Sequence, residues 1–265
     1  MQELLFAATW GEDETPDDRH SQLRVAALNV QGGGGGRTVG LAVWLARTRA
    51  DVLVLSELRL GNAPALLGEL RALGYTVREP DPSGSERTAV VAVKPEVLGE
   101  PFEPSMDRVS AVNLRVGERS LVVVGVYAPT NGMSAESSAV RAAWQRQFLR
   151  FVEELPAGAS TVISGDLNVL EPGHIPSLPF FEEHDYRFYS GLVECGFTDC
   201  FRHLSPTETD HSWYNPRYGA QRIDHTFVTT AMCGSLTGCR YDAAPVQSGI
   251  SDHSGMITDL DLDAL

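Results

Sequence analysis

The sequence of 265 residues predicts an α/β protein, a sandwich of two mixed β-sheets in a single domain. Apolar, valine-rich segments of strand length alternate along the chain with segments of helical periodicity. Neither a linker nor an internal repeat divides the chain. Hydrophobic residues make up 43% of the composition, which is enough apolar surface for one large core.

The first half of the chain predicts two strand–helix pairs and then three strands. A strand at 23–30 runs into five consecutive glycines and a helix at 37–50. A strand at 51–58 precedes a helix at 63–74, which ends at Gly74 because glycine favours the left-handed cap conformation. Three valine-rich strands separated by short turns follow, at 86–95, 108–117 and 119–129.

The second half predicts fewer strands and a longer connection. A long amphipathic helix at 136–155 precedes a buried strand at 160–170. An acidic, proline-rich loop at 171–185 comes next. The remaining predicted elements are a short helix at 189–196 and two late strands, at 221–230 and 254–262.

The charge of the chain is strongly acidic, with a formal net charge of −14. Residues 1–20 are expected to form an acidic, loose tail, and residues 21–265 the folded domain. Proteins that bind duplex DNA without sequence preference usually present a basic face. The acidic net charge therefore argues against strong non-specific binding to nucleic acid, although a local basic patch is still compatible with it.

Composition also indicates where the protein is located and in what state its cysteines are expected. No stretch approaches the roughly 18 apolar residues of a membrane span, and the first residues lack the basic region of a secretory signal. The four cysteines form no C-x-x-C pair, so free thiols are expected rather than a zinc site. We expect a cytoplasmic monomer without a membrane partner.

The glycine run, residues 32–36, raises the question of a nucleotide cofactor. A Walker loop would need Lys and Ser or Thr after Gly40, but Leu41 and Ala42 follow. The dinucleotide pattern also fails, because no register of the run has its third glycine. A turn, or a loop that shapes the edge of a site, is therefore favoured over a cofactor loop.

Polar side chains stand at the ends of several predicted strands: Asn29, Glu57, Tyr127, Asp166 with Asn168, Asp224 with His225, and Asp252 with His253. Burying such groups without partners costs several kcal/mol, so they must face one another or a ligand. Each alone could be a turn residue, an ion-pair partner or a satisfied core residue. Together they supply carboxylate and carboxamide oxygens, which suit Mg²⁺ or Mn²⁺ and not zinc.

The ordered motifs "LNV", "SEL", "VYAPTNG", "SGDLNV", "SWY", "QRIDHTFV" and "SDHSG" resemble the endonuclease/exonuclease/phosphatase superfamily. The resemblance covers nearly the whole chain from Asn29 onward. It implies a four-layer α/β sandwich, with two mixed sheets packed face to face between flanking helices. It also implies hydrolysis of phosphate esters with a divalent metal, Mg²⁺ or Mn²⁺.

Two features resemble the exonuclease III and abasic-site endonuclease branch most closely. Tyr127 stands where phosphatase-like members usually have a histidine, and residues 196–228 are similar to the corresponding segment of that branch. Trp213 matches an aromatic residue that borders the pocket for a base-free sugar, although core packing would also explain it. The resemblance thus implies a DNA phosphodiesterase, acting as an abasic-site endonuclease or a 3′ exonuclease.

The resemblance implies a catalytic role for five residues. Asp166 would orient or deprotonate the attacking water, and Asn168 would hold Asp166 and the phosphate. His253, oriented by Asp224, would donate to the phosphoryl oxygens. Tyr127 would contact the phosphate or assist the leaving oxygen.

The resemblance also implies ligands for the metal and the substrate. Glu57, supported by Asn29 and Asp252, would hold the metal. Substrate contacts are expected from Trp213, Asn168 and Arg141. Arg222, by contrast, is expected to be a structural ion-pair partner.

Departures from the branch leave the substrate open. Gln31 and glycines follow Asn29 where the nucleases often have Asp or Asn, and Lys94 is the only lysine. An alternative substrate is therefore RNA, a nucleotide or another small phosphoester. A third possibility is a binding domain without catalytic activity, which the full set of site residues argues against.

Overall fold

The computed structural model describes residues 21–265 except 78–85, 103–105, 131–133, 157 and 176–177, so the predicted tail lies outside the described residues. Within these described ranges, the strands form two six-stranded sheets and a small hairpin. Sheet A contains, in spatial order, β13 (Leu236–Asp242), β14 (Gly255–Asp261), β1 (Gln22–Gly32), β2 (Val52–Arg59), β4 (Arg87–Val93) and β3 (Thr76–Val77). Sheet B contains β5 (Leu98–Phe102), β6 (Val109–Val116), β7 (Arg119–Tyr127), β8 (Ser160–Asp166), β12 (Asp224–Thr229) and β9 (Phe197–Asp199).

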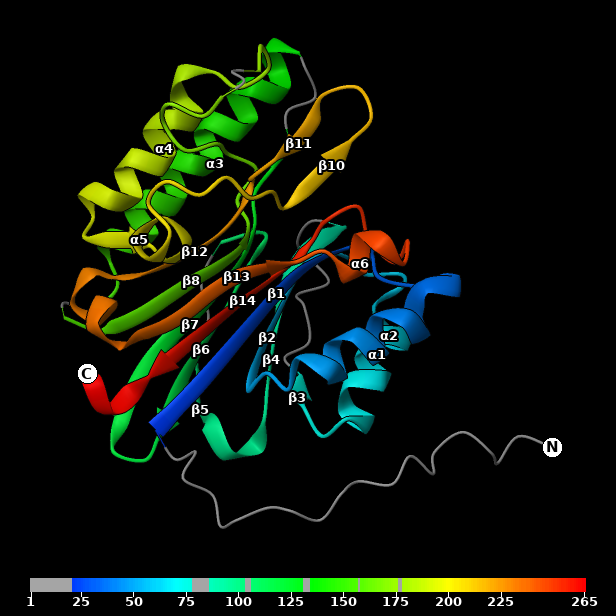
Figure 1. Cartoon of the computed structure of the whole chain (residues 1–265), viewed down its shortest axis with the longest axis vertical. Helices are drawn as coiled ribbons and strands as arrows, with labels where there is room; N and C mark the ends of the chain where they lie inside the picture. Colours follow the sequence, from blue (N-terminus) through cyan, green and yellow to red (C-terminus); the bar gives the residue numbers. More distant parts are fainter. Residues whose placement is uncertain (1–20, 78–85, 103–105, 131–133, 157, 176–177) are drawn as a thin grey trace.

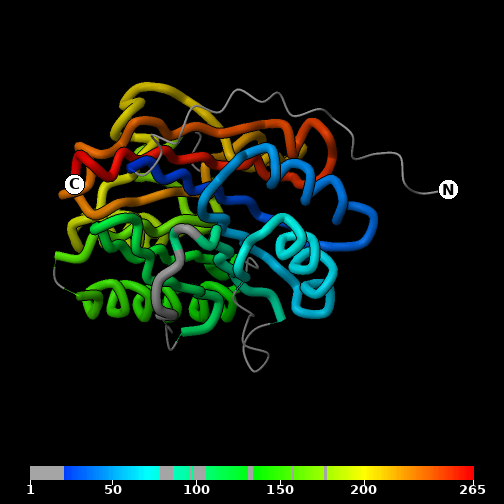
Figure 2. The backbone as a smooth tube through the Cα atoms, turned by 90° about the horizontal axis from the view of Figure 1, so that it is seen from below, coloured from blue at the N-terminus to red at the C-terminus, as the bar shows by residue number. Residues whose placement is uncertain are grey.

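The helices complete a four-layer sandwich, as predicted. Four longer helices are α1 (Thr38–Thr48), α2 (Ala63–Ala72), α3 (Ala135–Glu153) and α4 (Glu183–Glu194), with α5 (Cys200–Leu204) and α6 (Ala244–Gln247) shorter. Helices α1 and α2 lie on the opposite side of the sheets from α3 and α4 (Figure 1). The same separation is visible from below, with the blue and cyan helices on one side and the green helix on the other (Figure 2).

Alternating side chains along the strands build three apolar layers. The inter-sheet core contains Val25, Val54 and Val91 of sheet A and Val112, Val123 and Val162 of sheet B. The residues between them point outward: Leu28 and Leu55 pack under α1 and α2, and Val124 and Phe227 pack under α3 and α4. Near-continuous apolar strands are thus explained, because both faces of each sheet are covered.

The strand directions bring several strand ends together. Strands β1 and β2 are parallel, as are β7 and β8, while β4, β12 and β14 run antiparallel to their neighbours. The starts of β4, β12 and β14 therefore lie beside the carboxyl ends of the parallel strands. Residues far apart in the sequence meet at this end of the sandwich.

Some predicted boundaries in the second half were wrong. Helix α4 begins at Glu183, inside the predicted loop, because Glu182 and Asp185 form a reciprocal N-terminal cap there. Strand β13, the hairpin of β10 (Trp213–Asn215) and β11 (Gly219–Gln221), and the short β9 were not predicted. Their mixed polar and apolar sequences carry little periodic signal. None of the described helices has both the length and the apolar composition needed to cross a membrane.

The glycine run forms a turn that is packed at one end and open at the other. A Cβ atom at Gly33 would lie 2.7 Å from Leu58 Cδ1, and one at Gly34 would lie 2.8 Å from Asn62 Cβ. Nothing lies within 4 Å of the corresponding positions at Gly35 and Gly36. Arg37 closes the turn by donating to the Gln31 side chain and to the Ile250 carbonyl, at 3.0 and 2.9 Å.

Candidate active site

Side-chain alternation aims four of the predicted site residues into the space between the sheets. Each is four residues from a strand neighbour in the inter-sheet core: Asn29 from Val25, Tyr127 from Val123, Asp166 from Val162, and Asp224 from Val228. All four side chains are buried. Polar groups thus replace the valines of the core at one end of the sandwich.

Glu57 reaches the same space because strand β2 is irregular there. The register between β2 and β4 shifts between Leu55 and Leu58, and Glu57 has a φ of 54°. A bulge of this kind re-aims one side chain, here onto the inter-sheet side, at a cost of order 1–3 kcal/mol for the left-handed residue. Gln31 and Asn168, with φ of 47° and 51°, are left-handed as well, so strain gathers around the site.

Asn29 joins the carboxylates of the two sheets. Its Nδ2 donates to Glu57 Oε2 at 3.0 Å and to Asp166 Oδ2 at 2.8 Å. Its Oδ1 accepts the backbone N–H of Gln31 at 2.9 Å, which fixes the orientation of the amide. Asn29 therefore holds two acidic side chains at one point with a single amide group.

Asp166 carries the most perturbed carboxyl group of the site. Its Oδ1 accepts the backbone N–H of Asn168 at 3.0 Å, and the Asn168 side chain donates to the Ala128 carbonyl at 2.9 Å. Burial and the charge of Asp224 raise the pKa of Asp166 to about 8, although His253 and Asn29 act in the opposite direction. The ionised form of Asp166 thus lacks sufficient positive charge nearby.

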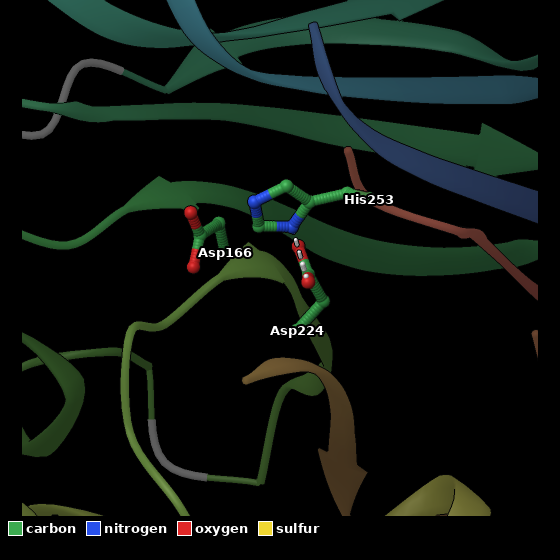
Figure 3. Close-up of side chains that lie close together, drawn as sticks. All are labelled: Asp166, Asp224 and His253. Carbon is green, nitrogen blue, oxygen red and sulfur yellow. Dashed lines mark hydrogen bonds and ion pairs between the residues drawn. The ribbon is translucent and has the colours of Figure 1, made fainter. Parts of the chain in front are cut away.

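His253 and Asp224 form a buried pair between the sheets. His253 Nδ1 lies 2.7 Å from Asp224 Oδ2, and the ring stands between Asp224 and Asp166 (Figure 3). Burial disfavours the imidazolium, but the charge and hydrogen bond of Asp224 outweigh it and raise the pKa of His253 to about 9. His253 is therefore a cation near neutral pH, with Nε2 free of Asp224 and able to donate elsewhere.

Asp252 and Trp213 border this pair. Trp213 Nε1 donates to Asp252 Oδ2 at 3.1 Å, and the Trp213 backbone bridges that of His253. Asp252 Oδ1 is buried and has no hydrogen-bond partner among the described residues, and it lies 3.7 Å from His253 Nε2. Asp252 and Trp213 thus lie beside His253, and Trp213 is half-buried against the apolar cluster that contains Ile223.

Two arginines surround Tyr127, and the sequence interpretation missed both. Arg108 lies over the phenol ring at 5.1 Å from its centroid, and Arg87 hydrogen-bonds the hydroxyl. Burial and the charges of Glu57 and Asp166 nevertheless raise the pKa of Tyr127 to about 12, so the phenol stays protonated. The signal for Arg87 was its phase with Val91 and Val93 on a strand that starts at the site.

Strand β12 sends neighbouring residues to opposite faces. Asp224 enters the site, whereas His225 points to the helix side and contacts Asp199 at 3.1 Å. Arg222 lies 2.7 Å from both Asp199 and Glu171, which confirms its predicted structural role. We call this group of Asp199, Arg222, His225, Glu171 and Arg202 the structural ion network.

Comparison with known proteins identifies this arrangement. The model of the endonuclease/exonuclease/phosphatase family matches residues 26–253. The chain belongs to this family. It is 28% identical over 127 residues to an exodeoxyribonuclease of Bacillus subtilis, covering 43% of this chain and 50% of the relative. The chain spans about half the length of the bacterial exodeoxyribonucleases it matches.

Solved structures share the fold. An AP endonuclease from Archaeoglobus fulgidus has a TM-score of 0.73 at 20% identity, covering 90% of this chain and 99% of that chain. A 3′ phosphatase from Neisseria bound to a product DNA hairpin has a TM-score of 0.74 at 21% identity, with the same coverage. Two mixed sheets between helices are therefore the family architecture in this chain.

Arg141 does not reach the site of this family member, which contradicts its predicted contact with substrate. Its side chain is 1% exposed and lies 2.5 Å from Asp185 Oδ2, between helices α3 and α4. A guanidinium enclosed in this way has no surface to offer a substrate. The phase of Arg141 with Gln145 and Phe148 on α3 marks it as inward-facing.

The donor set fits a divalent cation. The site contains four carboxylates, from Glu57, Asp166, Asp224 and Asp252. The cationic side chains described there are three, His253, Arg87 and Arg108, and Arg108 also lies 3.8 Å from Asp107. Ligand atoms of Asp166, Asp224 and His253 lie within 4.8 Å of one another. Excess acid, the unpartnered Asp252 oxygen and the raised pKa of Asp166 are each relieved by a hard cation with oxygen ligands.

Proposed function

We propose that this protein is a divalent-metal-dependent phosphodiesterase that hydrolyses DNA, at abasic sites or at 3′ ends. The observation that carries the proposal is the inter-sheet group of Asp166, Asp224 and His253, joined to Glu57 through Asn29. The names of the relatives, an exodeoxyribonuclease and an AP endonuclease, support DNA as the substrate.

In this proposal, one side of the site would bind the metal and activate the attacking water. Glu57, with Asp166 close by, would hold Mg²⁺ or Mn²⁺, which would polarise the phosphate and offset the charge that develops on it. Asp166 would accept a proton from the attacking water or orient it, since its raised pKa brings it near the pH of catalysis. Asn29 and the Asn168 backbone would keep that carboxylate in position.

The opposite side of the group would stabilise the phosphoryl oxygens. His253 Nε2 would donate to them, because Asp224 fixes the ring and keeps it protonated. The Tyr127 hydroxyl, protonated at neutral pH, would donate to the phosphate or to the leaving oxygen. Trp213 and Asn168 would border the bound substrate, and Asp252 would anchor Trp213.

The test is incision of a labelled duplex that contains one abasic site, with Mg²⁺ and separately with Mn²⁺. We expect metal-dependent cleavage that Asp166→Asn abolishes and that Glu194→Gln, an exposed carboxylate on α4, leaves unchanged. Equal cleavage by wild type and Asp166→Asn would overturn the assignment.

A small phosphoester or RNA substrate is the second candidate, favoured by the net charge of −14. The dependence of cleavage on salt concentration distinguishes duplex DNA from a small substrate. Cleavage of duplex DNA should weaken steeply as salt rises, since cations displaced from phosphates drive binding, whereas a small substrate should be nearly indifferent.

A further inference from the structure

Arg87 occupies an unusual place beside the carboxylate that is proposed to hold the metal. Its Nη1 lies 2.6 Å from Glu57 Oε1, while Glu57 Oε2 accepts from Asn29. Both oxygens of Glu57 therefore already have a donor. A cation that takes Glu57 as a ligand must compete with the guanidinium for Oε1.

The guanidinium also belongs to the substrate side of the site. It hydrogen-bonds the hydroxyl of Tyr127, a residue of sheet B, and its side chain remains 42% exposed. A cation that takes Glu57 Oε1 as a ligand would release the Nη1 group of this guanidinium, which lies at the solvent edge. A charged N–H donor of this kind forms short, strong hydrogen bonds with phosphate oxygens.

We propose that Arg87 and a divalent cation alternate at Glu57, and that the displaced Arg87 binds a phosphate oxygen of the substrate. The second part rests on the proposed function, because it assumes a phosphoester beside Tyr127. Without the cation, Arg87 neutralises Glu57 and holds it toward Asn29. With the cation bound, the positive charge of Arg87 is released to the phosphate, so metal binding prepares the substrate contact.

A neighbouring ion pair provides a matched control. Arg59, the last residue of β2, has its Nε 2.9 Å from Oε1 of Glu86, which immediately precedes β4. The Arg59 side chain is 43% exposed, as Arg87 is, but its partner Glu86 is 69% exposed. Arg59 is also the cross-strand register partner of Arg87, so its loss removes a similar charge at the same level of the sheet while the contact between Arg87 and Glu57 is kept.

The first experiment titrates Mn²⁺ into the full-length protein without substrate, followed by the electron paramagnetic resonance signal of free Mn²⁺. Arg87→Gln should bind Mn²⁺ about 5- to 10-fold more tightly than wild type, because the competing charge is gone. Arg87→Lys should stay near wild type, and Arg59→Gln should be unchanged. Equal or weaker Mn²⁺ binding by a folded Arg87→Gln would overturn the alternation, and Arg87→Ala serves if Arg87→Gln does not fold.

The second experiment measures kcat and KM for abasic duplex DNA at saturating Mn²⁺. Arg87→Gln should raise KM about 10-fold with kcat changed little, and Arg87→Lys should recover part of the loss. An unchanged KM would refute the phosphate contact, since a purely positional effect on Glu57 vanishes once the cation saturates. If the wild type cleaves nothing, the proposed function and this contact fail together, while the Mn²⁺ titration still decides the alternation.

Discussion

Two groups of charged side chains lie on opposite faces of the sheet at the start of β12, and they differ in their balance of charge. The structural ion network sets the carboxylates of Asp199 and Glu171 against two arginines and His225. The candidate site has four carboxylates and three cationic side chains, His253, Arg87 and Arg108, of which Arg108 also pairs with Asp107. One strand separates the two groups, because Asp224 and His225 point to opposite faces.

The aspartates of the two groups respond in opposite directions. Burial favours the neutral form of both, but hydrogen bonding to His225 and the charge of Arg222 hold the pKa of Asp199 well below its ordinary value. Asp166 has only the charge of His253, which pairs with Asp224, and burial together with the charge of Asp224 raises its pKa. A balanced set of buried charges stabilises the fold, whereas an acidic surplus marks a place for an external cation.

The largest expected effect is on catalysis. Asp166→Asn should lower cleavage about 10²- to 10⁴-fold, as expected when a positioned proton acceptor is lost. The free energy of unfolding should change by less than about 1 kcal/mol, because the lost hydrogen bonding is offset by removal of an uncompensated buried charge. Cleavage rates with urea unfolding of the same samples check both parts. A large loss of stability would mean that the two groups do not differ as described.

The matching change in the structural ion network should act on stability. Asp199→Asn leaves Arg222 buried with less compensation, so the free energy of unfolding should fall by about 3–5 kcal/mol. Urea unfolding measures this, with Glu194→Gln as the exposed control. Cleavage per folded molecule should stay near wild type, and a selective loss of kcat would place Asp199 in the site instead.

The pH dependence of the free energy of unfolding should also differ between the candidate site and the structural ion network. The pKa of His253 is raised from 6.5 to about 9, so the stability that it contributes is lost as pH rises from 6.5 through 9. The pKa of Asp166 is raised from 3.8 to about 8, so ionisation of this group lowers stability as pH rises from about 4 to 8. The pKa of Asp199 is lowered, so its contribution is lost only as pH falls below its ordinary range. Without divalent metal, the free energy of unfolding should fall between pH 6.5 and 9, measured by urea titration.

The same titration has an internal control in Asp166→Asn. This variant lacks one of the two groups that titrate in the alkaline range, so its decline should be shallower. Stability that holds constant or rises up to pH 9 in the wild type would contradict the raised pKa values.

The smallest expected effect is thermal stabilisation by the cation. At ten times its Kd, Mg²⁺ should add about 1.4 kcal/mol and raise Tm by about 2–4 °C. Glu57→Gln should reduce this shift, and Asp199→Asn should keep it on a lower baseline. Differential scanning calorimetry at fixed Mg²⁺ measures Tm for both variants and the wild type. An equal rise in Tm for all three would mean that the cation binds away from Glu57.

Much of the fold and most of the site could be predicted from the sequence. Valine-rich strands have a strong periodic signal, and Asn29, Asp166 and Asp224 stand in phase with valines of the inter-sheet core. What failed depends on three-dimensional context. In the sequence, Arg141 cannot be distinguished from an arginine on the surface. Only the packing of α3 against α4 shows that its side chain is buried in contact with Asp185.

Arg87 was missed for a related reason. Its contact with Glu57 depends on the bulge in β2, and one extra residue in a strand leaves no mark in the composition of the segment. The short β10–β11 hairpin was missed because each of its strands has only three residues, too few to show an alternating pattern. Sequence periodicity therefore reports regular elements well and their irregular ends poorly, although the ends are where the site lies.

Strand β14 fills the slot between β13 and β1, and His253 immediately precedes it. The order of synthesis thus differs from the order in space. Asn29, Glu57 and Asp166 leave the ribosome with more than a third of the chain still to come, whereas the histidine arrives with the strand that seals the sheet. A nascent chain therefore contains these acidic residues before their imidazole partner, and the proposed site is complete only when sheet A has closed.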